Sequence, residues 1–145
     1  MTTIDVASAG DLPDILAINR ESTSVHDAAR IDYLADAAGR GACLLAREDG
    51  AAAAFAVWDA SFYGFPFVWL LAVRPASRRR GIASALMRRV EAASGRDRVF
   101  TSTNESNTAM RALCTALGYA PSGRIDNLDE GDPELVFCRR LPGSG

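Results

Sequence analysis

The chain has 145 residues, of which 48% are hydrophobic and 23% charged, and its formal net charge is −2. These values are typical of one globular domain with one core, and they give no general affinity for nucleic acid. No stretch of about 18 apolar residues occurs, so we expect no membrane-spanning helix. All 16 basic residues are arginine, which excludes any mechanism that needs a catalytic lysine.

The three cysteines, Cys43, Cys114 and Cys138, lie in apolar stretches without CxxC spacing. This odd count, and an N-terminus without the features of a signal peptide, predict reduced thiols and a cytoplasmic protein. One histidine, His26, and three scattered cysteines predict no metal site. Heavy use of Ala and Arg indicates the codon bias of a GC-rich bacterial genome.

In chain order, the first half predicts a strand at 3–7, a helix from Asp11 to about Ser22, a helix at 27–38 and a hairpin of strands 42–47 and 51–59. Residues 67–73 (FVWLLAV) are continuously apolar, as expected for a central strand covered on both faces. The second half predicts a helix at 81–94, a strand at 99–103, a helix at 107–117, and strands at 119–122 and 134–140. This order is mixed α/β.

The segment between the central strand and the next helix carries three arginines, Arg78–Arg80, followed by Gly81. Positive charge at a helix N-terminus is unfavourable, which indicates that an anion binds there. A P-loop would need a lysine, a dinucleotide fingerprint a third glycine, and a serine hydrolase a Gly-x-Ser-x-Gly elbow; none of these is present.

Arg78-x-x-Gly81-x-Ala83, directly after a buried strand, resembles the acetyl-CoA signature of the GNAT superfamily of N-acetyltransferases. Asn107 and the Leu-Gly-Tyr segment at 117–119 are similar to a second superfamily motif. The resemblance spans residues 3–140 and is most specific between 67 and 119. It implies one GNAT-like domain over 1–141, with a disordered tail at 142–145. The implied fold is a mixed twisted sheet of six to seven strands with about four helices on both faces.

The resemblance also implies transfer of acetyl from acetyl-CoA to a primary amine, by direct attack in a ternary complex. Small residues at 81 and 83 let backbone N–H groups approach the pyrophosphate of coenzyme A. The end of the central strand would contact the pantetheine arm and splay from the strand at 99–103, leaving a cleft for the thioester. The implied cofactor-binding residues are Leu71, Ala72, Val73, Arg78, Arg79, Arg80, Gly81, Ile82, Ala83, Ser84 and Asn107.

The catalytic groups are less well specified. A backbone N–H near Val73 would hold the oxyanion. Cys114 stands where many members carry a tyrosine that protonates the leaving thiolate; its alternative role is a buried structural thiol. Ser102 stands where some members carry a glutamate base. The remaining candidates for the base are Asp59, Glu105, Glu130 and Glu134, or a chain of water molecules.

The acceptor is left open among a small amine, an amino acid, a polyamine, an antibiotic and a protein N-terminus. Residues 125–134 hold five carboxylates, which form either a solvated turn or an acidic rim that attracts a cationic amine. The aromatic residues Trp58, Phe62, Tyr63, Phe65 and Trp69 belong either to the core or to an acceptor pocket.

A second hypothesis is a CoA-binding regulatory or interaction module that has lost catalysis, because the tyrosine and the glutamate are replaced at 114 and 102. Nucleic-acid binding through the arginines is disfavoured, since the patch is short and lacks interleaved aromatic residues. Homodimers are common among members of the superfamily, but the sequence does not define an oligomeric state.

Overall fold

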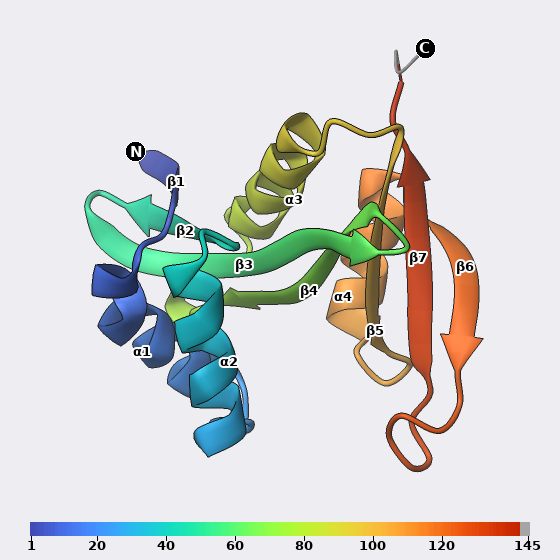
Figure 1. The fold of residues 1–145 in the computed structure, drawn as a ribbon, viewed down its shortest axis with the longest axis horizontal. Helices are drawn as coiled ribbons and strands as arrows, with labels where there is room; N and C mark the ends of the chain where they lie inside the picture. Colours follow the sequence, from blue (N-terminus) through green and yellow to red (C-terminus); the bar gives the residue numbers. More distant parts are fainter. Residues whose placement is uncertain (143–145) are drawn as a thin grey trace. The chain divides into compact units, whose positions relative to one another are not determined.

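The computed structural model describes residues 1–142 (Figure 1). The strands are β1 (Thr2–Val6), β2 (Cys43–Glu48), β3 (Ala51–Phe62), β4 (Phe65–Val73), β5 (Arg98–Asn104), β6 (Ala120–Ile125) and β7 (Glu134–Arg140). The α-helices are α1 (Leu12–Ser22), α2 (Ala28–Gly39), α3 (Ile82–Ala93) and α4 (Thr108–Leu117). Short 3-10 helices lie at Ala9–Asp11 and Pro75–Ser77.

The seven strands form one sheet in the order β1-β2-β3-β4-β5-β7-β6. β1 with β2, β2 with β3, β5 with β7 and β6 with β7 are antiparallel, whereas β4 and β5 are parallel. The predicted mixed sheet with about four helices is thereby confirmed. The tail predicted at 142–145 falls mainly on residues 143–145, which lie outside the described residues.

The chain contains two compact units, and β3 and β4 contribute to both. The first unit comprises Met1–Trp58 and Leu70–Arg89. The second comprises Asp59–Trp69 and the chain from Val90 onward.

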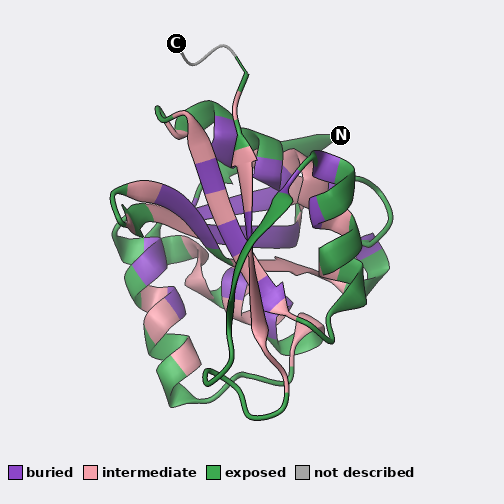
Figure 2. Ribbon diagram, turned by 90° about the vertical axis from the view of Figure 1, so that its right-hand side faces the viewer, coloured by how far each residue is buried: buried purple, intermediate pink, exposed green. Residues whose placement is uncertain are grey.

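In the first unit, α1 and α2 cover one face of the strands. Their fully buried Ile15, Ile18 and Leu34 belong to one apolar cluster with Phe55 and Val57 of β3. Side chains alternate between the faces of a strand, yet the intervening residues are buried as well (Figure 2): they are Leu44, Ala46, Ala54 and Ala56. Both faces of β2 at 43–46 and of β3 at 53–57 are therefore covered, as in the buried strands of α/β proteins.

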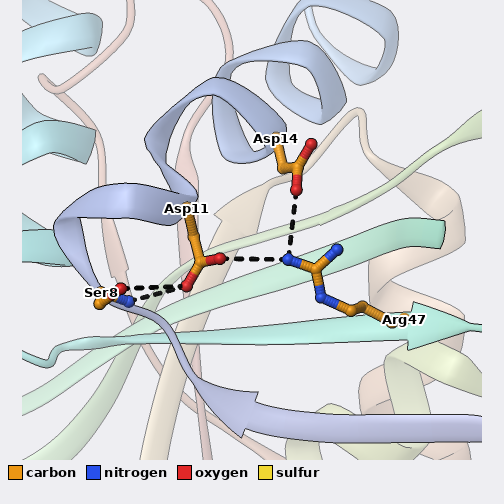
Figure 3. A network of polar contacts seen from close by, with 4 residues as sticks. All are labelled: Ser8, Asp11, Asp14 and Arg47. Atoms are coloured by element: carbon orange, nitrogen blue, oxygen red, sulfur yellow. Dashed lines mark hydrogen bonds and ion pairs between the residues drawn. The ribbon is translucent and has the colours of Figure 1, made fainter. Parts of the chain in front are cut away.

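An arginine on β2 joins this strand to the start of α1 (Figure 3). The Arg47 guanidinium lies 3.1 Å from Asp11 Oδ1 and 3.2 Å from Asp14 Oδ2. Asp11 also accepts a hydrogen bond from the Ser8 backbone N–H at 2.9 Å. The Ser8 N–H, and secondarily Arg47, hold the pKa of Asp11 below its ordinary value. Asp11 thus stands at the N-cap of α1 as predicted, but its carboxylate bonds to Ser8 and Arg47 and makes no side-chain hydrogen bond to the helix.

In the second unit, β5 alternates between buried and half-buried residues: Val99, Thr101 and Thr103 are buried, whereas Phe100 and Ser102 are half-buried. The Thr101 hydroxyl donates to the Val68 carbonyl of β4 at 2.9 Å. One face of β5 is therefore packed inward, and the other remains partly accessible.

A buried polar network stabilises the C-terminal part of this unit. The Tyr119 hydroxyl donates to Glu91 Oε2 at 2.8 Å, and Arg139 donates to Glu91 Oε1 at 3.0 Å. Burial, and then the Glu91 carboxylate, raise the pKa of Tyr119. The phenol therefore stays protonated and acts as a hydrogen-bond donor.

Several predicted bounds need correction. β3 extends to Phe62 and β6 to Ile125, and β4 begins at Phe65. Helix α2 ends at Gly39, one residue beyond the predicted helix at 27–38, and the chain then takes a left-handed conformation at Gly41, with φ of 74°. Among residues 1–142, no helix combines the length and apolar character that crossing a membrane requires.

The apolar cluster of the first unit predicts a stability effect. Leu34→Ala removes a side chain with 0% exposure, so we expect unfolding free energy to fall by about 2–5 kcal/mol. Ile31→Ala on the same helix, at a residue 39% exposed, should cost less than about 1 kcal/mol. Urea unfolding followed by circular dichroism measures both; equal losses would contradict this description of the core.

Candidate active site

The connection from β4 to α3 contains two residues with left-handed backbone. Arg79 has φ of 65° and Gly81 has φ of 78°. An L-residue in this conformation costs about 1–2 kcal/mol, so Arg79 is held there by its surroundings. Within residues 1–142, a Cβ built on Gly81 meets no atom within 4 Å. Gly81 is therefore needed for its dihedral angle, and the space beside it is open to a ligand.

The three arginines of this connection differ in their contacts. Arg80 donates to Glu48 Oε2 at 3.2 Å, and Arg78 Nε donates to the Val73 carbonyl at 3.3 Å. The Ser77 side chain, and then Arg80, lower the pKa of Glu48 below its ordinary value. Arg79 makes no side-chain hydrogen bond or ion pair with any residue in the described part of the chain. The sequence could not distinguish these three side chains.

The end of β4 is fixed from neighbouring elements of the first unit. The Arg74 backbone N–H donates to the Ala53 carbonyl at 2.9 Å, and its guanidinium lies 2.7 Å from Glu21 Oε2. Leu71, Ala72 and Val73 are half-buried. Their backbone groups therefore stand at the border between core and solvent, directly before the arginine turn.

The first residues of α3 divide between core and surface. Ile82 is 3% exposed, so its side chain belongs to the core, whereas Ala83 and Ser84 are half-buried. The Ala85 N–H donates to the Gly81 carbonyl at 3.0 Å, which starts the helical hydrogen-bond ladder. The N–H groups before this point have no partner inside the helix and are the ones an anion could use.

Asn107, in the second unit, is the N-cap of α4. Its Oδ1 accepts a hydrogen bond from the Met110 N–H at 3.1 Å. This is the capping role that Asn performs best. Its contact with the cofactor arm stays a prediction. Because Oδ1 caps the helix, the side-chain nitrogen would have to make that contact.

Cys114 is buried on α4, with 1% exposure. Burial raises its pKa to about 11. A thiol with a raised pKa is a weaker proton donor, so the structure favours the structural role of Cys114 over the acid role.

Ser102 and Glu134 lie together on β5 and β7. The Ser102 hydroxyl donates to Glu134 Oε2 at 2.7 Å, although the residues are 32 positions apart. Both are half-buried. The sequence placed Ser102 and Glu134 on separate strands and offered no signal for this pairing, which depends on the strand register.

The other carboxylates proposed as bases have different surroundings. Asp59 Oδ1 accepts hydrogen bonds from Trp69 Nε1 at 2.9 Å and from the Ser61 hydroxyl at 2.6 Å. Glu105 and Glu130 are exposed to solvent. Glu130 stands in the turn before β7, and no side-chain contact joins it to Ser102.

Carboxylates of the segment 125–134 are bound to local partners. Asp126 pairs with Arg124, Asp129 accepts from Asn104 Nδ2 at 2.9 Å, and Asp132 accepts from the Ser106 N–H at 3.1 Å. These contacts connect the segment to the β5–α4 turn. They support a structured turn more than a free acidic rim.

The aromatic residues of the second unit form a cluster. Phe62 contacts the rings of Phe67, Trp69 and Phe100 at centroid distances of 4.8, 6.5 and 5.1 Å. Trp69 is 40% exposed. Most of the cluster packs inward, and Trp69 offers an accessible aromatic surface. Among residues 1–142, no group of three His, Cys, Asp or Glu side chains could hold a metal ion.

The burial of the cysteines predicts their reactivity. Burial raises the thiol pKa of Cys43 to about 12 and of Cys114 to about 11, so both remain protonated at pH 8. Burial raises the thiol pKa of Cys138 as well, but this residue is only partly buried and can be reached from solvent. We therefore expect one fast equivalent with a thiol reagent at pH 8, located at Cys138 by mass spectrometry, and three equivalents in urea. Rapid labelling of Cys114 in the folded protein would contradict its placement.

Comparisons with known proteins agree with this arrangement. Residues 12–119 match the model of the acetyltransferase (GNAT) family. A GNAT-family acetyltransferase from Bacillus cereus ATCC 10987 is 35% identical, over 97% of this chain and 98% of that one, with a TM-score of 0.89. A sequence search of curated proteins finds no match.

Two more distant structures share the fold. The ribosomal-protein-S18-alanine N-acetyltransferase of Escherichia coli is 20% identical, over 100% and 97% of the two chains, with a TM-score of 0.86. A diaminobutyrate acetyltransferase of Paenibacillus lautus, solved with L-2,4-diaminobutyric acid and coenzyme A, is 19% identical over 94% of each chain, with a TM-score of 0.77. From the family match and the 35% identity, the chain belongs to the GNAT family of acetyltransferases.

Proposed function

We propose that this acetyltransferase moves an acetyl group from acetyl-CoA to a primary amine, by direct attack of the amine in a ternary complex. The observation that carries the proposal is the left-handed turn at Arg79 and Gly81 before α3, with open space beside Gly81. The chemistry of these residues fits the pyrophosphate of coenzyme A.

The fit to a pyrophosphate has three components. Backbone N–H groups of the turn and of the α3 N-terminus donate to phosphate oxygens. The helix dipole favours the anion by about 0.3–1 kcal/mol. Arg79, and Arg78 once it leaves the Val73 carbonyl, add charge-assisted hydrogen bonds. Arg80, bound to Glu48, holds the turn against β2.

The end of β4 would bind the remainder of the coenzyme. Leu71, Ala72 and Val73 would offer backbone groups to the pantetheine arm, and the Val73 N–H would donate to the developing oxyanion. Asn107 would contact the arm from the start of α4. These assignments follow the family resemblance and the half-buried position of the strand end.

The reaction needs a neutral amine. Its nitrogen attacks the thioester carbonyl, a C–N bond forms, the C–S bond breaks, and coenzyme A leaves as a thiolate that takes up a proton. Cys114 is a poor donor for that proton because it is buried with a raised pKa. We propose that solvent, or the base that deprotonated the amine, supplies it.

The acceptors of the two distant structural neighbours support the proposed class of acceptor. By their names, one acts on the alanine of a ribosomal protein and the other on diaminobutyrate, and both acceptors carry a primary amine. We propose a primary amine here for the same reason, supported by the accessible Trp69. The second candidate, a CoA-binding module without catalysis, is favoured by the two replacements, the buried Cys114 in place of the tyrosine and Ser102 in place of the glutamate.

The coenzyme site predicts the effect of one substitution. Gly81→Asp places a carboxylate beside the pyrophosphate and strains a φ of 78°. We expect acetyl-CoA affinity, measured by isothermal titration calorimetry, to fall about 100-fold or more, the scale of several kcal/mol for a like-charge contact.

The matched control for Gly81→Asp is Gly95→Asp. Gly95 has φ of 66°, and within residues 1–142 its Cβ would also meet no atom within 4 Å, but it lies after α3. This variant carries the same charge and backbone strain and should bind acetyl-CoA like the wild type. Equal affinity of both variants and the wild type would contradict the site.

A further inference from the structure

We propose that Glu134 accepts the proton of the attacking amine and that Ser102 orients its carboxylate. This inference rests on the proposed function, because it supplies the base that acetyl transfer to an amine requires. It uses contacts within the second unit alone.

The register of the strands places the two residues on one face. Ser102 stands opposite Val136, and Asn104 stands opposite Glu134, in the antiparallel β5–β7 ladder. Residues directly opposite share a face, and so do residues two apart on one strand. The Ser102 and Glu134 side chains therefore occupy the accessible face of β5, opposite the buried Val99, Thr101 and Thr103.

The hydrogen bond leaves the carboxylate available. Ser102 Oγ donates to Oε2 at 2.7 Å, and within residues 1–142 no side chain donates to Oε1. Glu134 is the first residue of β7 and lies beside the carboxyl end of β5, which is parallel to β4. In open α/β sheets, ligands bind outside the carboxyl ends of parallel strands. A fixed and half-buried carboxylate at this position can receive a substrate proton.

Glu134 has no charged residue directly opposite it on the neighbouring strands, and the nearby aspartates are bound to other residues. Across the ladders it faces Asn104 and Ile125, which carry no charge. From the preceding loop, Asp129 and Asp132 are held by Asn104 and by Ser106. These two aspartates therefore bind residues at or next to the β5–α4 connection, whereas Glu134 accepts its hydrogen bond from Ser102 on β5.

An aromatic surface on the same face completes the acceptor site. Phe67 of β4 pairs with Phe100 of β5, so Trp69 and Ser102 follow two residues further along their strands. Ring contacts with Phe62 put Trp69 on the Phe100 face. An aromatic ring and a carboxylate together attract an ammonium group. The site therefore fits a cationic primary amine that arrives protonated.

The Glu134 carboxylate takes one proton from the R–NH3⁺ group, and the neutral nitrogen attacks the acetyl carbonyl. The C–S bond breaks, the second nitrogen proton is lost, and the thiolate gains one proton. The net products are the acetamide, coenzyme A thiol and one released proton.

The test compares Glu134→Gln and Ser102→Ala with the wild type by thiol release from acetyl-CoA between pH 7 and 9.5. The acceptors are L-2,4-diaminobutyric acid, spermidine and a peptide with N-terminal alanine. We expect Glu134→Gln to lower kcat/KM about 100-fold at pH 7, the lower range for a lost general base. Ser102→Ala should cause a smaller loss, and acetyl-CoA affinity should be unchanged in both variants.

The pH profile separates a base from a structural residue. An α-amino group has an ordinary pKa of about 7.7–8.0, so the peptide becomes neutral without help at high pH. The defect of Glu134→Gln should therefore shrink as pH rises. Asp32→Asn, which removes an exposed carboxylate from α2, is the charge control and should match the wild type.

Two results would overturn the inference. If the wild type is active and the kcat/KM of Glu134→Gln lies within twofold of it, Glu134 is not the base. A loss in Glu134→Gln that is equal at every pH would also contradict this role, and neither result would contradict the proposed function. A wild type that binds acetyl-CoA but releases no thiol with any of the three acceptors would contradict the proposed function, and the inference with it.

Discussion

The turn before α3 combines positive charge with a constrained backbone, and the proposed coenzyme site depends on this combination. Three arginines stand beside a helix N-terminus, where positive charge is unfavourable, and the backbone adopts two left-handed conformations at Arg79 and Gly81. Isolated, this arrangement would be strained and self-repelling. A bound pyrophosphate would relieve the repulsion, and contacts from outside the turn hold its shape.

Those contacts come from β2, β3 and α1. Glu48 on β2 binds Arg80, while Glu21 on α1 binds the Arg74 guanidinium and Ala53 on β3 accepts the Arg74 N–H. The end of β4 and the turn are therefore positioned by several elements together. A preorganised turn of this kind would lose little freedom on binding an anion.

In the second unit, several carboxylates have structural roles, and one, Glu134, is placed to accept a proton in the proposed reaction. Asp129 and Asp132 fix the loop before β7 to the β5–α4 turn, and Glu91 is buried between Tyr119 and Arg139. Glu134 differs because a single serine hydroxyl holds it on a half-buried face. In the proposed reaction, Glu134 removes the proton from the acceptor amine.

The sequence was most informative where an apolar run is bounded by proline or glycine. The segment from β4 through α3 was predicted to within about two residues, because a continuous apolar run ends at Arg74-Pro75 and a glycine precedes the helix. β6 was predicted too short because all six of its residues are exposed, so that no apolar alternation marks its end.

Side-chain partnerships were beyond the sequence. Arg80 binds a residue 32 positions before it, and Ser102 binds one 32 positions after it. Both pairs depend on how strands and turns are brought together. Composition and periodicity describe single elements, so they could name Arg80 and Glu134 as candidates. They could not show that Arg80 binds Glu48 and holds the turn, or that Glu134 accepts a hydrogen bond from Ser102.

Hydrogen–deuterium exchange reports on the backbone N–H groups of the β4–α3 turn, so it tests whether this turn binds the pyrophosphate of acetyl-CoA. Exchange should be measured with and without saturating acetyl-CoA, at single-residue resolution across the β4–α3 connection. We expect the amides from Arg79 to Ser84 to become protected when the coenzyme binds. Protection confined to other segments, or binding without protection of this turn, would contradict binding of the pyrophosphate there.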